Sequence, residues 1–464
     1  MEEKISKALT LAAIASLFFR RGIFHPFIVQ PFEILILLAS IFGVISIIKN
    51  GIDEETKKEL GYWGKWFLLF FVLMGIGFIY SLIFYKMDYQ ILVNLLKNYF
   101  ILLCDFLTFF LILYHKNSVN FFKKSLVSFL GPLVFAPAVF FPVLILFVSI
   151  TEGFGSLFLG FHTSRTDFGN FLIIPSSILI AYFFRSQNVF RKTAAWIGLV
   201  ILIALVLWTG AGNAYLGIFL VSLFIFFLMI REKKNFLWVG KSFLLLFLAV
   251  VSAYLILPER AQNTPIFKMF PKLSYLANIK ASDAHYEDFL KSGITPATFM
   301  PELGSYTPVK SIKNKDLLKM VSKNFHPEID LSDRKYIWSQ SILILAKNPL
   351  GLSPAYEYII KIKVLPDSDT VGGSHNTFLQ IGLSGGWISL ILFFLFIYKI
   401  FKLLGDSKND DWEWLAIAGA SFGIFTTLFL DTRMLNPWVW VIISLAVAYS
   451  YTRGKSESLE NKNP

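Results

Sequence analysis

Long apolar runs, separated by shorter polar segments, make up most of the chain. A helix needs about 20 mainly apolar residues to cross the hydrocarbon of a bilayer, and most of these runs approach or reach that length. They lack the alternation of apolar and polar residues that is typical of membrane barrel strands. The pattern therefore predicts an all-α, polytopic membrane protein with about 12 transmembrane helices. The expected helices cover residues 5–19, 28–48, 64–84, 90–114, 125–150, 169–185, 194–209, 213–230, 236–257, 376–399, 413–430 and 436–452.

One long hydrophilic segment, residues 258–374, interrupts this pattern after the ninth expected helix. Its basic and acidic residues nearly balance, and it is long enough to form a small folded unit. We therefore expect transmembrane helices 1–9 within residues 1–257, a large periplasmic loop over 258–374 and transmembrane helices 10–12 within 375–452. A cytoplasmic tail is expected over 453–464, and its residues 454–464 are expected to be disordered.

Short amphipathic helices are expected near the end of the loop. Apolar residues recur at nearly helical spacing over 334–347, and Asp333 can cap the first turn of that helix. A second short helix is expected over about 354–363, because a proline favours a helix start. The chain then delivers His375 to the start of the tenth transmembrane helix, where Ser374 is available as the cap.

The composition and the cysteine content exclude other classes. Hydrophobic residues make up 55% of the chain and charged residues 16%, whereas soluble domains carry about 25% charged residues. The mean hydropathy is +0.62. The single cysteine, Cys104, lies in an apolar run, so it can form neither an internal disulfide nor a cysteine metal site. The first apolar stretch lacks a small-residue cleavage site, and we interpret it as an anchor.

The distribution of basic residues predicts the orientation. If the N-terminus is cytoplasmic, twenty Lys and Arg lie on the cytoplasmic side. The short loops on the other side then hold five: Arg20, Arg21, Lys86, Arg165 and Arg433. The positive-inside rule therefore places both termini in the cytoplasm. Much of the net charge of +12 lies where anionic membrane lipids attract it, so nucleic acid is not an expected partner.

His375 is the first candidate for chemistry, because it stands at the outer start of a transmembrane helix. The positive end of the helix dipole there favours a neutral ring that can accept a proton. The free amides of the same first turn suit a phosphate oxygen. The alternative is an interfacial histidine that only caps the helix or reaches toward the headgroups.

Arg334 and Arg165 are the next candidates, since both fall on the expected outer side. An arginine offers a fixed fork of donors that matches phosphate oxygens, and it keeps its charge. Each arginine alone is equally typical of a solvated or salt-bridged residue. Asp333 and Asp167 are neighbours with which they could pair.

Two acidic clusters in the loop have the ligand types of a metal site. Asp367 and Asp369 follow a proline shortly before His375, and hard cations take oxygen ligands from such pairs. His285 and Asp288 belong to a similar group with Glu287. Acid-rich turns are common in loops, so both clusters are better explained as loop structure.

Charged residues inside the expected transmembrane helices are costly and deserve a function or a partner. Glu33, Lys97 and Asp105 are such residues. Lys97 and Asp105 lie eight residues apart and could face one polar seam, either for helix packing or along a transport path. Gly385 and Gly386 are expected to permit close contact between helices.

Three stretches resemble the bacterial O-antigen ligase and O-antigen polymerase superfamily: RKYIWSQSILILAKNPLGL, GGSHNTFLQIGLSGGWISLILFF and DTRMLNPWVW. The family pattern is an Arg, a Trp, a Pro-Leu-Gly step, a His-Asn pair and a Gly-rich turn. It falls here on Arg334, Trp338, Pro349-Leu350-Gly351, His375-Asn376 and Gly385-Gly386. The resemblance in motifs covers about residues 334–440, and the earlier part is similar in arrangement only.

The resemblance implies a GT-C-like fold in the bacterial inner membrane. It also implies a transferase that moves a glycan from an undecaprenyl-pyrophosphate carrier to a lipid or glycan acceptor on the periplasmic side. His375 would be the catalytic histidine, and Arg334 and Arg165 would bind the pyrophosphate. Asn376 and Trp338 would support them. The resemblance implies no cofactor and no metal, because arginines and helix amides can stabilise the leaving pyrophosphate.

One departure from the family pattern concerns the start of the eighth helix. Relatives usually have a Ser-Arg-Gly run there, and this chain has Gly210-Ala211-Gly212-Asn213. The usual arginine is absent, and Arg165 could substitute for it. A non-catalytic member of the family is therefore one alternative.

The acceptor stays open between lipid A-core, another lipid-linked chain and a protein serine, and we favour the first, which is that of a ligase. A transporter or flippase for lipid-linked glycans is the alternative from another class. Paired broken helices and internal repeats would favour a transporter, and neither is visible in the sequence.

Overall fold

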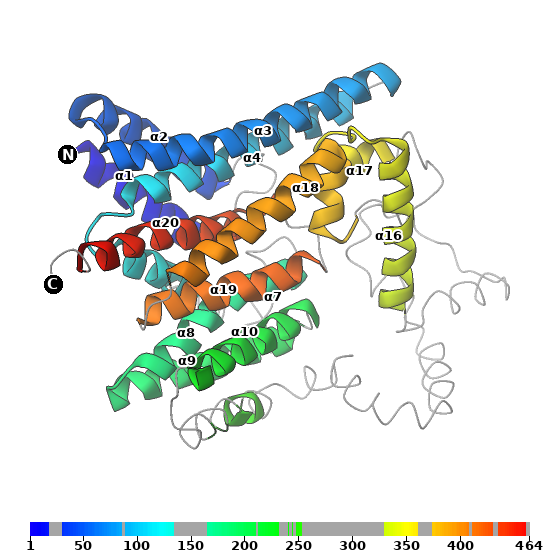
Figure 1. The fold of residues 1–464 in the computed structure, drawn as a ribbon. Coiled ribbons are helices and arrows are strands. Elements are labelled where there is room, and N and C mark those ends of the chain that lie inside the picture. The colour runs from blue at the N-terminus through cyan, green and yellow to red at the C-terminus, as the bar shows by residue number, and fades with distance from the viewer. Residues whose placement is uncertain are drawn as a thin grey trace, which may run out of the picture. The chain divides into compact units, whose positions relative to one another are not determined.

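A computed structural model describes residues 1–17, 30–85, 89–133, 165–209, 212–231, 240, 244, 247–252, 329–360, 374–407, 411–429 and 435–460. Most of these residues are helical, and none of those described lies in a strand (Figure 1). The all-helical prediction is therefore confirmed for this part of the chain. The helices are α1 (Glu2–Ser16), α2 (Pro31–Asn50), α3 (Glu54–Phe84), α4 (Tyr89–His115), α7 (Arg165–Phe171), α8 (Ile173–Arg185), α9 (Val189–Thr209), α10 (Gly212–Arg231), α16 (Ile329–Lys347), α17 (Tyr356–Ile359), α18 (Thr377–Asp406), α19 (Trp412–Leu428) and α20 (Pro437–Glu460).

Seven helices among the described residues are long and apolar enough to cross a membrane. They are Pro31–Asn50, Glu54–Phe84, Ile91–His115, Asp167–Arg185, Val189–Val206, Asn213–Arg231 and Thr377–Asp406. Each coincides with a helix predicted from the apolar pattern. Three further predicted spans coincide with α1, α19 and α20, and the apolar part of α20 is Pro437–Thr452. The remaining two, over 125–150 and 236–257, lie largely outside the described residues. α20 continues to Glu460, so the expectation that the tail is disordered is wrong for its described part.

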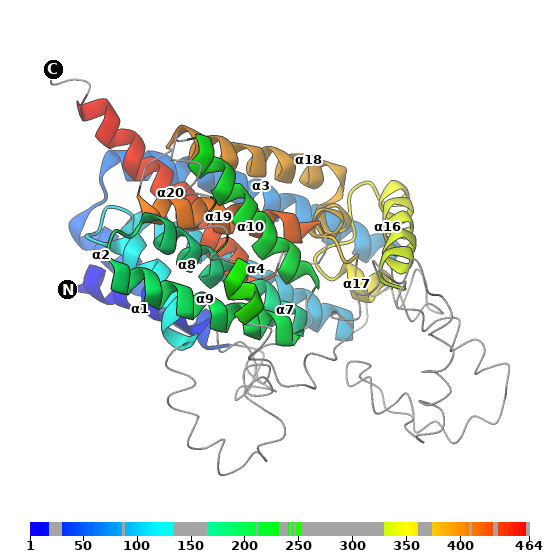
Figure 2. The same cartoon turned by 90° about the horizontal axis from the view of Figure 1, so that it is seen from below.

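The chain divides into two compact units, one of residues 1–257 with 337–464 and the other of 258–336. In the first unit, α18, α19 and α20 lie between the group α2–α4 and the group α7–α10 (Figures 1 and 2). α19 packs against α8 and α10, while α20 packs against α4 and α18 against α3. The described residues of the second unit are the first turns of α16.

Aromatic side chains fill the space where α3, α4, α18 and α20 meet. The ring centroid of Phe396 lies 5.4 Å from that of Trp63 and 6.2 Å from that of Trp440. Phe67 packs against Phe106 with centroids 4.2 Å apart. Such tilted and edge-on pairs add to the energy of burial. The last helices are therefore tied to α3 and α4, although they are far apart in the chain.

The charged residues of the predicted spans have structural environments that differ from one another. Glu33 is buried and accepts a hydrogen bond from the Gln30 backbone N–H at 2.8 Å, as the third residue of a capping box. Lys97 is exposed, whereas Asp105 is fully buried. Because one side chain is exposed and the other is fully buried, Lys97 and Asp105 do not share one polar seam in the described structure.

The short helices of the loop differ from the prediction at their starts. α16 ends at Lys347 as expected but begins at Ile329, so Asp333 lies inside the helix and is not its cap. Of the helix expected over 354–363, α17 covers Tyr356–Ile359, and residues 361–363 lie outside the described part of the chain. The extra turn of α16 carries few apolar residues, which is why the apolar period did not reveal it.

Candidate functional site

His375 lies in the turn that leads into α18. Its side chain is exposed, and its backbone has a φ of 45°, in the left-handed region. The cap of α18 is Asn376, whose Oδ1 accepts a hydrogen bond from the Leu379 backbone N–H at 3.1 Å. The expectation that Ser374 caps this helix is therefore wrong. Both residue types are good caps, and Ser374 is used in another contact.

Asn376 also fixes the start of α18 to a neighbouring helix. Its Nδ2 donates to the Phe429 carbonyl oxygen at 3.0 Å, at the end of α19. The ring of Phe378, two residues further on, packs on that of Phe429 with centroids 4.3 Å apart. The asparagine is buried, whereas the histidine before it is exposed. The start of α18 is thus fixed by its contacts with the end of α19, whereas the imidazole of His375 is exposed.

Ser374 forms a bridge across the histidine. Its hydroxyl donates to the Asn376 carbonyl oxygen at 2.9 Å, so one hydrogen bond joins the residues on both sides of His375. Left-handed backbone is costly for a residue with a Cβ, and short side-chain-to-backbone bonds of this kind stabilise such turns. The conformation of His375 therefore depends on the hydroxyl of Ser374.

Tyr356 and Glu357, which the sequence analysis missed, extend this chain of hydrogen-bonding groups. The hydroxyl of Tyr356 lies 3.3 Å from Ser374 Oγ and donates to Glu357 Oε1 at 3.1 Å. Tyr356 is buried, and burial raises its pKa well above the usual value. Burial of the carboxyl group also raises the pKa of Glu357, from 4.5 to about 7, although the hydrogen bond from Tyr356 opposes this. An acid among the apolar and aromatic residues of PAYEYII is the signal that could have identified it.

α18 is interrupted at Gly386, in the part of the helix that follows His375. Gly386 has φ 79° and ψ −177°, values that no helix contains. The segment after α16 fills the break: the N–H groups of Leu352 and Ser353 donate to the carbonyl oxygens of residues 383 and 384, at 2.6 and 2.9 Å. In the other direction, the Trp387 N–H donates to the Pro349 carbonyl at 3.1 Å. Three of the backbone groups beside the break are thereby paired.

Glycine is required where these two segments meet. A Cβ on Gly386 would lie 2.2 Å from the Pro349 carbonyl oxygen, and one on Gly351 would lie 2.5 Å from the Gly386 nitrogen. Both residues also have a positive φ. The sequence analysis expected contact between helices at Gly385 and Gly386. At Gly386 the close partner is instead the backbone of the loop that enters the break.

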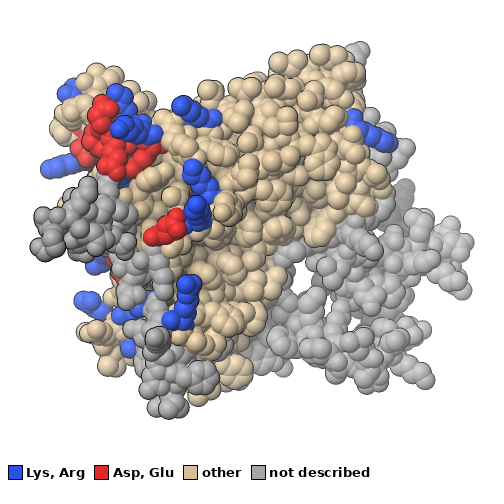
Figure 3. All heavy atoms as spheres, viewed as in Figure 1, with Lys and Arg blue, Asp and Glu red and all other residues tan. Residues whose placement is uncertain are grey.

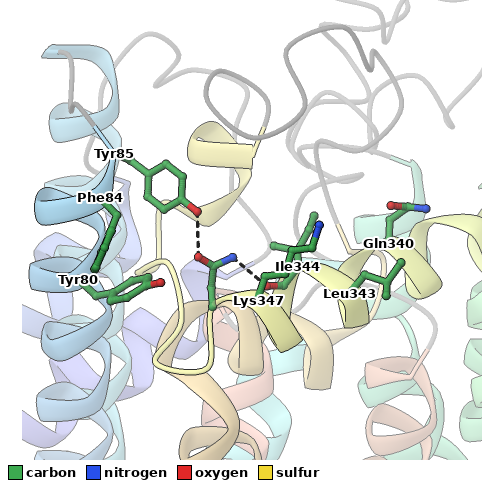
Figure 4. Close-up of a pocket in the computed structure, with 8 residues that line it drawn as sticks. Tyr80, Phe84, Tyr85, Gln340, Leu343, Ile344 and Lys347 are labelled. Atoms are coloured by element: carbon green, nitrogen blue, oxygen red, sulfur yellow. Dashed lines mark hydrogen bonds between the residues drawn. The ribbon is translucent and has the colours of Figure 1, made fainter.

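A cavity of about 400 Å³ lies beside the start of this loop (Figure 4). Tyr80, Phe84 and Tyr85 line it from the end of α3, and α16 lines it opposite. The Tyr85 hydroxyl donates to Asn348 Oδ1 at 2.9 Å, and Asn348 Nδ2 donates to the Ile344 carbonyl at 2.8 Å. The last turn of α16 is thus anchored to α3, which fixes where the loop 349–353 begins.

For the other predicted site residues, the structure describes the backbone but not every side chain. Arg334 falls in α16 and Arg165 begins α7, but the side chains of both arginines lie outside the described part of the structure. Trp338 is half-buried on α16. Asp167 is buried, and its Oδ1 accepts from Asn436 Nδ2 at 3.2 Å.

Several other predicted positions fall outside the described residues. These are His285, Glu287, Asp288, Asp367, Asp369, Gly210 and Ala211.

The helices define an α-helical, multi-pass membrane protein in which a broken helix presents a histidine at its start. Residues 197–394 match the family model described as O-antigen ligase. The match confirms, for these residues, the resemblance predicted from the motifs. The match includes the positions of both Arg334 and His375. The family is one of membrane enzymes that process glycans. A comparison with curated proteins finds no match.

Proposed function

We propose that the protein is a membrane-embedded glycan transferase of the O-antigen ligase type. It transfers a polysaccharide or oligosaccharide from an undecaprenyl-pyrophosphate carrier to lipid A-core on the periplasmic face. The observation that carries the proposal is the exposed imidazole of His375 at a fixed helix start, inside the segment that matches the family. The same surroundings would serve a polymerase, which extends a lipid-linked chain and differs in its acceptor.

The proposed reaction is a single displacement at the anomeric carbon of the donor. A hydroxyl oxygen of the acceptor forms the new bond to this carbon, while the bond to the pyrophosphate oxygen breaks. His375 takes the proton from the hydroxyl, because a sugar alcohol is a poor nucleophile without a base. Undecaprenyl pyrophosphate leaves with the bonding electrons, and the configuration at the anomeric carbon inverts.

Charge stabilisation of the leaving group completes the mechanism. Pyrophosphate is a good leaving group, so fixed positive charge helps it more than a strong acid does. Arg334 and Arg165 would supply this charge as bidentate partners of the phosphate oxygens. We propose that no metal and no cofactor takes part, with Asn376 and Trp338 as supporting residues.

The proposed topology has twelve transmembrane helices in a GT-C-like arrangement in the bacterial inner membrane, with both termini cytoplasmic. α3 and α18 support it by running antiparallel: a Cβ on Gly77, late in α3, would lie 2.6 Å from the Ser384 carbonyl, early in α18. At the other end, Lys399 donates to the Tyr62 hydroxyl. Lys49, at the end of α2, pairs with Glu2 at the start of α1. The start of α18 therefore lies at the end of the bundle away from Glu2.

The surface charges support the same orientation. On the visible face, most of the Lys, Arg, Asp and Glu side chains gather toward the end where α1 begins (Figure 3). This end is the one that the positive-inside rule places in the cytoplasm. The histidine, at the opposite end, would then face the periplasm.

Replacing His375 by Ala tests the proposed function. The purified variant, given a synthetic undecaprenyl-pyrophosphate glycan and a core acceptor, is expected to release undecaprenyl pyrophosphate at least about 100-fold more slowly. Cells that carry it should lack attached polymer on a polysaccharide gel. A stably inserted variant with unchanged release would exclude the proposed role. Loss of release from the unaltered protein on chelation would exclude the metal-free mechanism, and a transporter would release no carrier at all.

A transport function finds no support at the break in α18. In transporters, the carbonyls freed by a broken helix bind ions. Here the carbonyls of residues 383 and 384 accept from the N–H groups of Leu352 and Ser353, so these two backbone groups are already used.

A further inference from the structure

A chain of hydroxyl groups leads from the carboxyl group of the half-buried Glu357 to the turn that holds His375. The Tyr356 hydroxyl is 3.1 Å from Glu357 Oε1 and 3.3 Å from Ser374 Oγ. Ser374 Oγ is 2.9 Å from the Asn376 carbonyl oxygen, on the far side of the histidine. Three oxygen–oxygen contacts therefore connect Glu357 to the backbone on both sides of His375.

The number of protons decides whether all three contacts can be hydrogen bonds. With an ionised carboxylate, only the hydroxyls of Tyr356 and Ser374 supply protons, and two protons cannot fill three contacts. Tyr356 then donates to Glu357, and its oxygen competes with the Asn376 carbonyl for the proton of Ser374. With a protonated carboxyl, Glu357 donates to Tyr356, Tyr356 to Ser374 and Ser374 to the Asn376 carbonyl. Every contact is then filled, and such chains strengthen cooperatively.

The surroundings of Glu357 favour the protonated form. Glu357 is half-buried. Burial raises its pKa to about 7. In the described part of the chain, Tyr356 is the one titratable group that contacts the carboxyl, and no charged side chain pairs with it. The stability that the neutral carboxyl contributes is therefore full below the usual pKa of 4.5 and is lost as pH rises through about 7.

We propose that protonated Glu357 is a positioning residue for His375, acting through Tyr356 and Ser374. The inference rests on the proposed function, in which His375 accepts the proton of the acceptor hydroxyl. When Glu357 ionises, Tyr356 donates to the carboxylate and its oxygen competes with the Asn376 carbonyl for the proton of Ser374, so the bond across His375 weakens. The imidazole then leaves the geometry that proton transfer requires.

Four variants test the proposal through the release of undecaprenyl pyrophosphate, measured from about pH 6 to about pH 9. Glu357→Gln keeps a neutral donor for Tyr356, so we expect nearly unaltered kcat at neutral pH and no loss of kcat above it. The unaltered protein should lose kcat as pH rises through about 7. Glu357→Ala, Tyr356→Phe and Ser374→Ala each break the chain, and should lower kcat about tenfold with little change in KM.

Two controls separate this inference from the proposed function and from a purely structural role. Glu3→Gln, at an exposed acid on the first helix, should leave the pH profile unchanged. If His375→Ala has no effect, the proposed function fails. If His375→Ala abolishes release but Glu357→Gln keeps the alkaline loss of kcat, the positioning role of Glu357 is excluded. A variant that lowers thermal stability without moving the profile would also exclude it.

Discussion

His375 is held in place by the residues on both sides of it. Its φ of 45° costs a residue with a Cβ about 1 kcal/mol or more. The Ser374 hydroxyl offsets part of this cost by bonding to the Asn376 carbonyl. Asn376 in turn caps α18 and binds the Phe429 carbonyl. The backbone at this position is therefore fixed, while the imidazole has no packing constraint from burial.

Replacing His375 by Gly or by Ala should separate the effect of the backbone conformation on stability from the effect of the imidazole on glycan transfer. Both variants lack the imidazole and should lose glycan transfer alike. The glycine variant should be more stable than the alanine variant by about 1 kcal/mol, because only glycine adopts left-handed backbone without strain. Thermal unfolding of the two purified variants in the same detergent measures the difference. An alanine variant at least as stable as the glycine variant would contradict the described turn.

Replacing Asn376 should show two effects of different origin. Asn376→Ala loses both the cap and the bond to Phe429, and should cost about 1–2 kcal/mol. Asn376→Asp keeps the acceptor for the Leu379 N–H but loses the donor toward Phe429, so its loss in thermal stability should be smaller. Equal losses for both variants would assign the whole effect to the contact with α19.

At the scale of elements, the break in α18 is the feature on which the site depends. The loop 349–353 enters the break and pairs with backbone groups on both sides of Gly386. The Tyr85–Asn348 bond anchors the start of this loop to the end of α3. The half of α18 that begins after His375 is therefore positioned by three other elements, α3, α16 and α19.

Replacing Gly386 by Ala should disrupt this arrangement. The added Cβ would lie 2.2 Å from the Pro349 carbonyl oxygen, at a residue with positive φ. We expect a loss of several kcal/mol in stability, or failure to accumulate in the membrane. Gly405→Ala, in the same helix, is the matched control, because a Cβ there meets nothing within 4 Å. Similar yields and melting temperatures for the two variants would contradict the proposed role of the break.

At the scale of the whole molecule, most charged side chains on the face shown in Figure 3 gather at the end where α1 begins, and the start of α18 with the histidine lies at the opposite end. The single cysteine, Cys104, is fully buried and leaves the surface without a thiol. Introduced cysteines can therefore report on the two ends separately. Tyr89, at the start of α4, and Val189, at the start of α9, are both exposed in the described structure.

Thiol labelling of intact cells should distinguish these two positions. A membrane-impermeant maleimide should label Tyr89→Cys from outside the inner membrane, and should label Val189→Cys only after the membrane is opened. The unaltered chain should stay unlabelled in both cases, since Cys104 is buried. Labelling of Val189→Cys in intact spheroplasts would reverse the proposed orientation.

The helices could be predicted from the sequence because apolar length alone determines a span in a bilayer. The capping residue could not, since Ser374 and Asn376 are equally good caps and the choice depends on Tyr356, eighteen residues earlier. In the sequence, Gly386 could not be distinguished from a small residue at a contact between helices. Its partner is the backbone of the loop 349–353, which only the fold brings next to it. Glu357 was missed for the same reason. Its significance comes from burial and from two hydroxyl groups that only the fold brings together.

The pairing of residues 349–353 with α18 also restricts how the chain can vary in length. Surface connections usually tolerate inserted or deleted residues. Here the Leu352 and Ser353 amides must reach the carbonyls of residues 383 and 384, while Trp387 must reach Pro349. One inserted residue would move all three partners out of register, so this connection should be as intolerant of indels as the interior of a helix.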